Sequence, residues 1–286
     1  MRVLGRGDLP PLLASTHGPP RRLYLRGEGE PELLARPAVA VVGARACSAY
    51  GAQVARMLGR ELAAAGLVVV SGMARGIDGE AHRGALETDG HTVAVLGCGI
   101  DRAYPAAHAS LARAIAGRSL LISEYEPGVP PAPFRFPERN RIVAGLCAAT
   151  IVVEARERSG ALITADFALD EGREVFAVPG EITSTLSAGT NALLRLGATP
   201  LTSADDILEA FGLDVPVREA PSHPLLGLLP ATADELVRLS GLASGTVAAT
   251  LAELELQGMV VEGDGIYRKV LPGARSSLMT PLTAPD

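Results

Sequence analysis

AVAVVG, at residues 38–43, and LVVVSG, at residues 67–72, decide the fold, because both are short runs of β-branched and small apolar residues. Between them, residues 51–65 carry apolar side chains at helical spacing. A strand, a helix and a second strand in this order predict a β-α-β unit, whose two strands lie parallel. Each run is apolar throughout, as in strands that are buried on both faces.

The same alternation continues toward the C-terminus. Further strands are predicted at residues 92–97, 119–123, 150–155 and 174–180, and helices at about 79–89, 106–116, 139–148, 161–171, 190–196 and 204–211. This pattern predicts an α/β fold: a Rossmann-like, doubly wound, mostly parallel sheet with helices on both faces. Ligands of such sheets bind beyond the carboxyl ends of the strands.

The pattern also divides the chain into domains. The predicted Rossmann-like domain spans residues 38–211 and follows a short N-terminal extension at 1–37. Four prolines and little periodicity mark residues 212–230 as a linker. Two short helices and a hairpin at 231–271 are typical of a small winged-helix domain. Residues 272–286 have the composition of a disordered tail.

The composition excludes several mechanisms. Lys269 is the sole lysine among 26 basic residues and lies outside any Gly-rich loop, which excludes a Walker A site and a Schiff-base enzyme. Cys47, Cys98 and Cys147 are far apart, so neither a disulfide framework nor a zinc knuckle is expected. We expect no metal and no cofactor. The net charge is −6, and no signal peptide or membrane-spanning run occurs, so we expect a cytoplasmic protein with no membrane partner.

Small residues follow three successive strands. The loops are Gly43-Ala44-Arg45, the segment 71–78 with Ser71, Gly72 and Arg75, and Gly97-Cys98-Gly99. Glycines at such turns let a phosphate approach the backbone N–H groups of the following helix. With Arg45 and Arg75 they predict an anion cradle, although glycine also serves purely steric needs in such loops. A dinucleotide fingerprint is absent because Arg102 stands where its third glycine belongs.

The stretch PPAPFRFPERNR at residues 130–141 combines prolines, two phenylalanines and three arginines. An extended chain places Phe134 and Phe136 on one side and Arg135 on the other, with a helix beginning near Asn140 between Arg139 and Arg141. Phenyl rings stack on unpaired bases and guanidinium groups bind phosphates, so this stretch favours single-stranded nucleic acid. The alternative is a rigid loop that buries its rings and pairs its arginines with Glu138.

Two further sites follow the strand at 150–155. Ser159 and Gly160 begin a helix, where the hydroxyl and the first N–H groups either bind a phosphate or form an ordinary helix cap. Glu154 is a candidate catalytic carboxylate. His82 shares a helical face with Asp78, but no nucleophile accompanies it, so a structural histidine is favoured.

Taken in order, several motifs resemble those of the DNA-processing protein family DprA, also called Smf. They are VGAR (42–45), SGMARGIDGEAH (71–82), VLGCGIDRAYP (95–105), FPERNRIVAGL (136–146), SGALITADFAL (159–169) and GTNALLRLGA (189–198). The resemblance covers about residues 9–201. It implies a dimeric protein without known catalysis, which binds and protects single-stranded DNA during natural transformation and loads the RecA recombinase on it.

The resemblance also implies roles for particular residues. Arg45, the Ser71-Gly72 turn, Phe136, Arg139 and Arg141 would line the DNA pocket. A surface for the dimer or the recombinase would include Asn191, Leu193, Leu194, Leu196, Leu208 and Phe211. Ala44 and Thr190 stand where a Ser and a Cys are frequent in the family. The N-terminal helical domain of many members is expected to be mostly missing, with residues 1–37 as its remnant.

Two other functions remain open. Related sheets occur in nucleotide phosphoribohydrolases, where Glu154 would act at the sugar, but the PGG turn of those enzymes is missing here. The winged-helix segment favours a transcription regulator, but its second helix, residues 244–257, has no basic residue. Because a recognition helix lies beside phosphates, we expect this domain to contact protein rather than duplex DNA.

Overall fold

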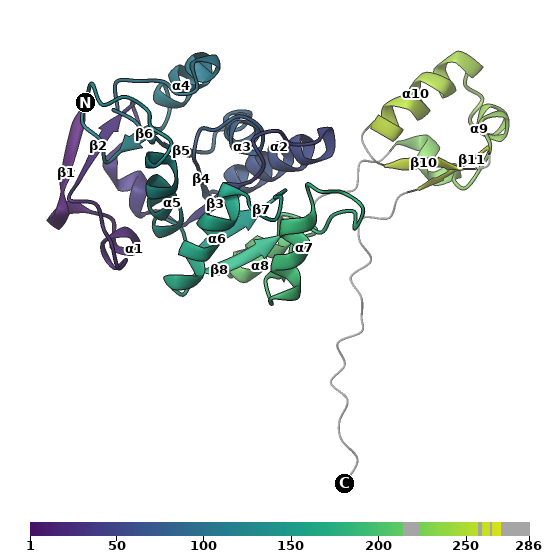
Figure 1. Ribbon diagram of the computed structural model, residues 1–286. Coiled ribbons are helices and arrows are strands. Elements are labelled where there is room, and N and C mark those ends of the chain that lie inside the picture. The colour runs from purple at the N-terminus through teal and green to yellow at the C-terminus, as the bar shows by residue number, and fades with distance from the viewer. Residues whose placement is uncertain (214–222, 257–258, 264, 270–286) are drawn as a thin grey trace, which may run out of the picture. The chain divides into compact units, whose positions relative to one another are not determined.

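The computed structural model describes residues 1–213, 223–256, 259–263 and 265–269 (Figure 1). The chain separates into two compact units, one before and one after residue 216. The first unit contains a nine-stranded sheet in the order β1-β2-β6-β5-β4-β3-β7-β8-β9. Its strands are β1 (Arg2–Gly5), β2 (Arg22–Arg26), β3 (Ala38–Val42), β4 (Val68–Ser71), β5 (Thr92–Val95), β6 (Leu120–Ser123), β7 (Ala149–Val152), β8 (Glu174–Ala177) and β9 (Thr199–Pro200).

Strands β3 to β9 pair in parallel, whereas β2 is antiparallel to both β6 and β1. From β3 the chain builds the sheet outward through β4, β5 and β6, then returns to the other side of β3 with β7. The gap between β3 and β7 is therefore the topological switch point, where ligands of doubly wound sheets bind. The predicted Rossmann-like, mostly parallel sheet is confirmed.

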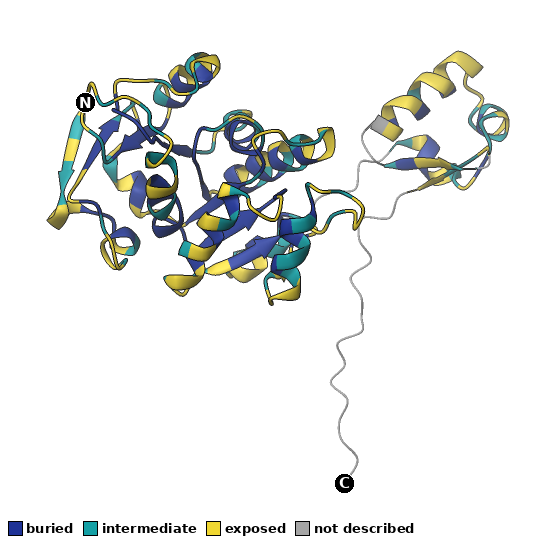
Figure 2. Cartoon of the chain, in the orientation of Figure 1, coloured by how far each residue is buried: buried dark blue, intermediate teal, exposed yellow. Residues whose placement is uncertain are grey.

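Helices cover both faces of this sheet. One face carries α2 (Ala49–Ala64), α3 (Ile77–Leu86), α4 (Ala109–Ala116) and α8 (Asp205–Ala210), and the other carries α5 (Arg135–Gly145), α6 (Gly160–Asp170) and α7 (Ala188–Arg195). In β3, Val39 and Val41 pack against the first layer, while Ala40 and Val42 pack against the second. The central strands are thus buried on both faces, as Figure 2 shows in dark blue. This explains why their sequences are apolar throughout.

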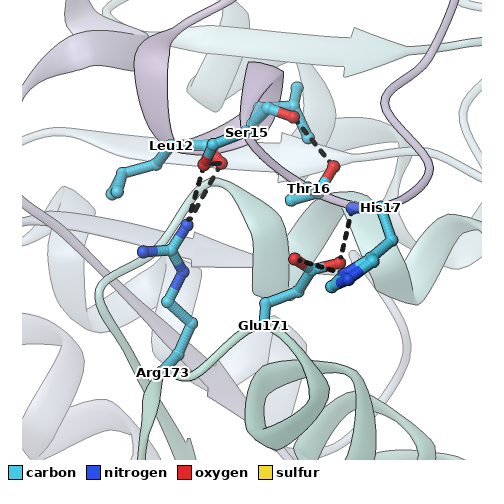
Figure 3. A network of polar contacts seen from close by, with 7 residues as sticks. Leu12, Ser15, Thr16, His17, Glu171 and Arg173 are labelled. Atoms are coloured by element: carbon cyan, nitrogen blue, oxygen red, sulfur yellow. Dashed lines mark hydrogen bonds and ion pairs between the residues drawn. The ribbon is translucent and has the colours of Figure 1, made fainter.

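The structure differs from the sequence-based division at the N-terminus. Strands β1 and β2 extend the sheet beyond β6, so residues 1–37 belong to the first unit. The turn after the short helix α1 (Pro11–Ala14) is held by the loop between α6 and β8 (Figure 3). There the His17 backbone N–H donates to Glu171 (2.9 Å), and Arg173 donates to the Leu12 carbonyl (3.2 Å) and to Ser15 Oγ (3.3 Å). The sequences of β1 (RVLG) and β2 (RLYLR) include arginines, so neither shows the continuous apolar run that marks the central strands.

Helix α5 begins at Arg135 rather than near Asn140. The extended chain that was predicted to carry Phe134 and Phe136 on one side is therefore wrong. Pro137 lies in the first turn of the helix, where a backbone N–H has no intrahelical partner, so proline is tolerated there. The prolines before it do not keep the chain extended into the arginine motif.

The second unit contains α9 (Ala233–Ser240), α10 (Ser244–Leu256) and a hairpin of β10 (Val260–Gly263) and β11 (Ile266–Lys269). Thr232 and Glu235 form a capping box at α9, and Gly241 ends that helix in the left-handed region (φ 70°). A 3₁₀ helix, η4 (Pro224–Leu228), packs into its core through Leu225 and Leu226. Part of the predicted linker is therefore structured, while residues 214–222 and the predicted tail at 272–286 lie outside the described residues.

None of the helices that the structure describes is long and apolar enough to cross a bilayer.

Candidate nucleic-acid interface

A pocket of about 410 Å³ opens at the carboxyl ends of β3, β4 and β7. Its walls come from the loops after these strands, from the N-terminal end of α6 and from one face of α5. We call it the switch-point pocket. It contains six of the residues predicted from the sequence: Arg45, Gly72, Arg139, Asn140, Ser159 and Gly160.

Two arginines of this pocket were not predicted. Arg156 and Arg158 follow β7 and are exposed, and neither has an ion-pair partner within the described part of the chain. The signal was present in the sequence EARERSG, where two arginines follow a buried strand, at the edge of the sheet where ligands bind. With Arg45 they place three exposed guanidinium groups around one opening.

Helix α6 supplies a further source of positive potential. It has eleven residues, and its first turn has no acidic side chain. Ser159 caps it by accepting the Ala161 N–H (3.3 Å), and Asn140 Nδ2 donates to the Gly160 carbonyl (3.0 Å). The capping hydroxyl and the first turn of α6 thus line the pocket, and that turn contains no acidic side chain of its own.

The N-terminus of α2 lies at the same edge of the sheet, but there the chain's own carboxylate occupies it. Glu154 is buried and accepts the Ser48 backbone N–H (2.9 Å) and the Ser48 hydroxyl (2.5 Å), directly before α2. Gly51 is required beside it, because a Cβ there would overlap the Glu154 carboxylate. Glu154 does not line the switch-point pocket. The candidate nucleophile of the phosphoribohydrolase hypothesis is therefore engaged in capping a helix.

An aromatic pair lies at the rim of the pocket. The rings of Phe136 and Tyr104 are stacked, with centroids 5.3 Å apart and an interplanar angle of 25°. The Arg45 guanidinium lies over the Phe136 ring at 5.4 Å. Tyr104, which is 45% exposed, was not predicted, because it lies 32 positions before Phe136 in the sequence, in a separate loop.

Arg139 has a structural role that the sequence did not predict. It is 4% exposed and donates to the carbonyls of Gly72 and Val95, at the ends of β4 and β5. Burial lowers the pKa of Arg139 to about 10. Because this value is still well above neutral pH, the side chain remains charged there. It contributes charge to the pocket from beneath the surface. This burial does not favour the predicted direct contact between Arg139 and DNA.

Asp78 is the acidic counterpart at the floor of the pocket. Its Oδ2 accepts the backbone N–H groups of Gly72 (3.1 Å) and Ala74 (3.2 Å) and so fixes the turn after β4. Burial raises the pKa of this carboxyl, while the charges of Arg139 and Arg45 oppose that shift. Ser71 is also internal: it is fully buried and donates to the Val41 carbonyl (2.6 Å). This burial does not favour the predicted contact between the Ser71 side chain and DNA.

The other predicted arginines lie outside the switch-point pocket. Arg141 projects from another side of α5 and forms an ion pair with Glu124. Arg75 is exposed but does not line the pocket. Arg135 lies over the rings of Tyr125 (5.3 Å) and Phe134 (5.1 Å). The interpretation that Glu138 pairs with an arginine is also wrong, because its partner is the Tyr125 hydroxyl (2.8 Å).

The predicted dimer or partner surface separates into two groups. Leu196 at the end of α7 is 85% exposed, and Leu194 and Asn191 are half-buried. Leu193 and Leu208 are buried in the core instead, with Leu208 1% exposed, and Phe211 is partly buried against the core. Leu208 cannot take part in a surface contact in this conformation. The described residues contain no group of His, Cys, Asp and Glu that could hold a metal ion.

Comparison with known proteins identifies the family. The family model of DNA recombination-mediator protein A matches residues 1–212. This chain belongs to that family. The DprA winged-helix domain model matches residues 224–265, which confirms the predicted winged helix. As a DprA family member, the chain is a DNA recombination-mediator protein, as the motifs indicated.

Several DprA proteins are similar to this chain. The putative DNA processing protein DprA of Mycobacterium tuberculosis is 45% identical over 273 residues, which are 89% of this chain and 70% of that protein. An X-ray structure of Streptococcus pneumoniae DprA has a TM-score of 0.70 at 45% identity and covers 73% of each chain. A Helicobacter pylori DprA structure, reported for its single-stranded DNA binding mode, has a TM-score of 0.67 at 32% identity and covers 73% of this chain and 94% of that one.

Proposed function

We propose that this DprA family member binds single-stranded DNA in the switch-point pocket and acts without catalysis. The observation that supports this most directly is the convergence of Arg45, Arg156, Arg158 and the N-terminal end of α6 on one opening. Guanidinium groups and helix N-termini both bind phosphates. The pocket combines them with little opposing charge, since Asp78 is buried and bonded to backbone N–H groups.

The aromatic rim supports the preference for a single strand. Phe136 and Tyr104 present stacked rings beside the arginines, and a ring can stack on a base only when that base is unpaired. The acidic net charge of −6 does not oppose this function, because binding depends on the local charge of the pocket. The H. pylori relative, described as binding single-stranded DNA, has the same fold.

The proposed cellular role follows the family. The protein would act in the cytoplasm as a homodimer that protects incoming single-stranded DNA and loads RecA on it during natural transformation. An apolar surface between α6 and α7 supports the dimer. There a hollow of about 500 Å³ is lined by Leu162, Ile163, Leu193 and Leu196, and Leu196 is mostly exposed. The winged-helix domain, with no basic residue on α10, would contact protein.

Fluorescence anisotropy with a labelled single strand tests the DNA site. The variant Arg45→Ala/Arg156→Ala should lose about 1 to 3 kcal/mol of binding free energy for each charged contact. Its slope of log K against log salt should become shallower by about 0.7 for each phosphate released. The control Arg6→Ala/Arg113→Ala removes the same charge from exposed positions outside the pocket.

The variant Phe136→Ala separates stacking from charge. It should weaken binding to a single strand and leave residual binding to a duplex unchanged. Equal affinities of wild type and the Arg45→Ala/Arg156→Ala variant, with both folded, would refute the assignment of the pocket.

A further inference from the structure

A second groove, of about 640 Å³, lies on the other side of α5, beside β2. Its lining includes Arg21, Arg22, Tyr24, Glu124, Tyr125 and Arg141. We call it the β2 groove. Arg141, which was predicted to line the DNA pocket, lines the β2 groove instead of the switch-point pocket.

The charges of the β2 groove favour an anionic ligand. Arg141 is neutralised by its ion pair with Glu124 and also donates to the Gly18 carbonyl (2.6 Å). Arg21 and Arg22 are exposed and have no hydrogen-bonded or ion-paired side-chain partner within the described part of the chain. Glu126 is the acid that remains without such a pairing. Two free guanidinium groups against one carboxylate leave the groove positive.

The two sites are connected by the N-terminal end of α5. Arg45 lines the switch-point pocket and lies over Phe136, in the first turn of α5. The adjacent residue, Arg135, lies over Phe134 (5.1 Å) and over Tyr125 (5.3 Å), and Tyr125 lines the β2 groove. Rings and guanidinium groups therefore follow one another from the pocket to the groove.

The exposed rings along this connection are available for stacking. Phe134 is 60% exposed, and the adjacent Arg135 guanidinium lies over its ring at 5.1 Å. The Tyr125 hydroxyl donates to Glu138 (2.8 Å), which fixes its ring beneath Arg135. A positive groove lined with aromatic faces is the combination that binds a single strand without sequence preference.

We propose that a single strand bound in the switch-point pocket continues across Phe136, Arg135 and Phe134 into the β2 groove, where Arg21 and Arg22 bind its phosphates. This inference rests on the proposed function, because the pocket supplies the first part of the path. The ligand is the same polynucleotide, and the groove extends the bound length. Residues 1–37, which carry both arginines, thus gain a binding role in addition to the strands they add to the sheet.

Oligonucleotide length distinguishes the two sites. Single strands of about 6 and about 14 thymidines span the range of site sizes in proteins that bind DNA in this way. Anisotropy is measured with both for wild type, for Arg21→Ala/Arg22→Ala, and for the charge-matched control Arg6→Ala/Arg113→Ala. All four substituted side chains are exposed, and thermal melting checks that the variants fold.

The expected result depends on length. Arg21→Ala/Arg22→Ala should bind the short strand within about two-fold of wild type but lose about ten-fold for the long strand. Its salt slope on the long strand should become shallower by about 1.4, or 0.7 for each of two phosphates. On the long strand, the logarithm of the affinity should fall less than half as far for the control as for Arg21→Ala/Arg22→Ala. Unchanged binding of the long strand, or equal losses for both lengths, overturns the proposal. A wild type that binds neither strand overturns the proposed function itself.

Discussion

Arg139 and Arg141 are two residues apart in one motif, yet the structure predicts that removing Arg139 lowers the free energy of unfolding more than removing Arg141. Arg139 is buried and donates to the carbonyls of Gly72 and Val95. It is also the charge that most opposes the raised pKa of Asp78. Arg141 is 27% exposed, its ion-pair partner Glu124 is 17% exposed, and Arg141 also donates to the Gly18 carbonyl.

The magnitudes follow from these environments. Arg139→Ala leaves two buried carbonyls without a donor and Asp78 without a compensating charge. Breaking such a buried charged network costs about 3 to 5 kcal/mol in the free energy of unfolding. Arg141→Ala removes a partly buried ion pair and leaves Glu124 without its partner, which should cost less, about 1 to 3 kcal/mol. Arg139→Met keeps most of the side-chain volume and should lose nearly as much as Arg139→Ala, because the loss is polar.

Urea unfolding followed by circular dichroism measures both changes by linear extrapolation. DNA affinity is measured at the same time, in buffer without urea. The reasoning would be refuted by an Arg139→Ala protein within 1 kcal/mol of wild-type stability that nevertheless binds DNA more weakly. That result would make Arg139 a DNA ligand, as the sequence alone suggested, rather than a support for the β4 and β5 loops.

Two further predictions concern the core and the proposed dimer. Burial lowers the pKa of His82 to about 3, and its Nδ1–H donates to Thr92 Oγ1 (2.7 Å), which itself donates to the Val69 carbonyl. The unfolded chain gains a proton near pH 6.5 that the folded chain does not, so the free energy of unfolding should fall by about 2 kcal/mol between pH 7 and pH 5 through this residue. His82→Gln should flatten that pH dependence in urea titrations, and an unchanged slope would contradict the assignment. Leu196→Glu places a charge on the exposed apolar surface of α7 and should convert dimers to monomers in light scattering, whereas Ile182→Glu, at a 96% exposed position outside that surface, should not. Dimers that persist in Leu196→Glu would exclude α7 from the interface.

The parallel sheet was predictable because its evidence is local. Each of the strands β3 to β8 is a buried apolar run followed by a helix, and such runs are visible in the sequence without knowledge of their neighbours. β1 and β2 were missed because their sequences include arginines rather than a continuous apolar run, and β9 because it has two residues. Their pairing with the rest of the sheet leaves no periodic signal in the sequence.

The sequence predicted which loops form the candidate site, but it did not predict where the side chains of those loops point. Chemistry and the position after a strand were sufficient to select Arg45, Ser159 and Gly160, which the structure brings together. The sequence could not show that Arg139 is buried, since that depends on carbonyls supplied by β4 and β5. Nor could it show that Tyr104 stacks on Phe136, because the fold brings the two rings together from separate loops.

Helix α5 is a wall shared by two cavities, and this makes the length of its motif more critical than any one of its side chains. Arg139 and Arg141 point in different directions because each residue advances the helix by about 100°. A substitution alters one cavity and spares the other. A single inserted residue before Arg139 would instead turn every later side chain by the same angle and misalign both cavities at once. Protein engineers who wish to retune this family should therefore exchange residues within the motif and leave its spacing untouched.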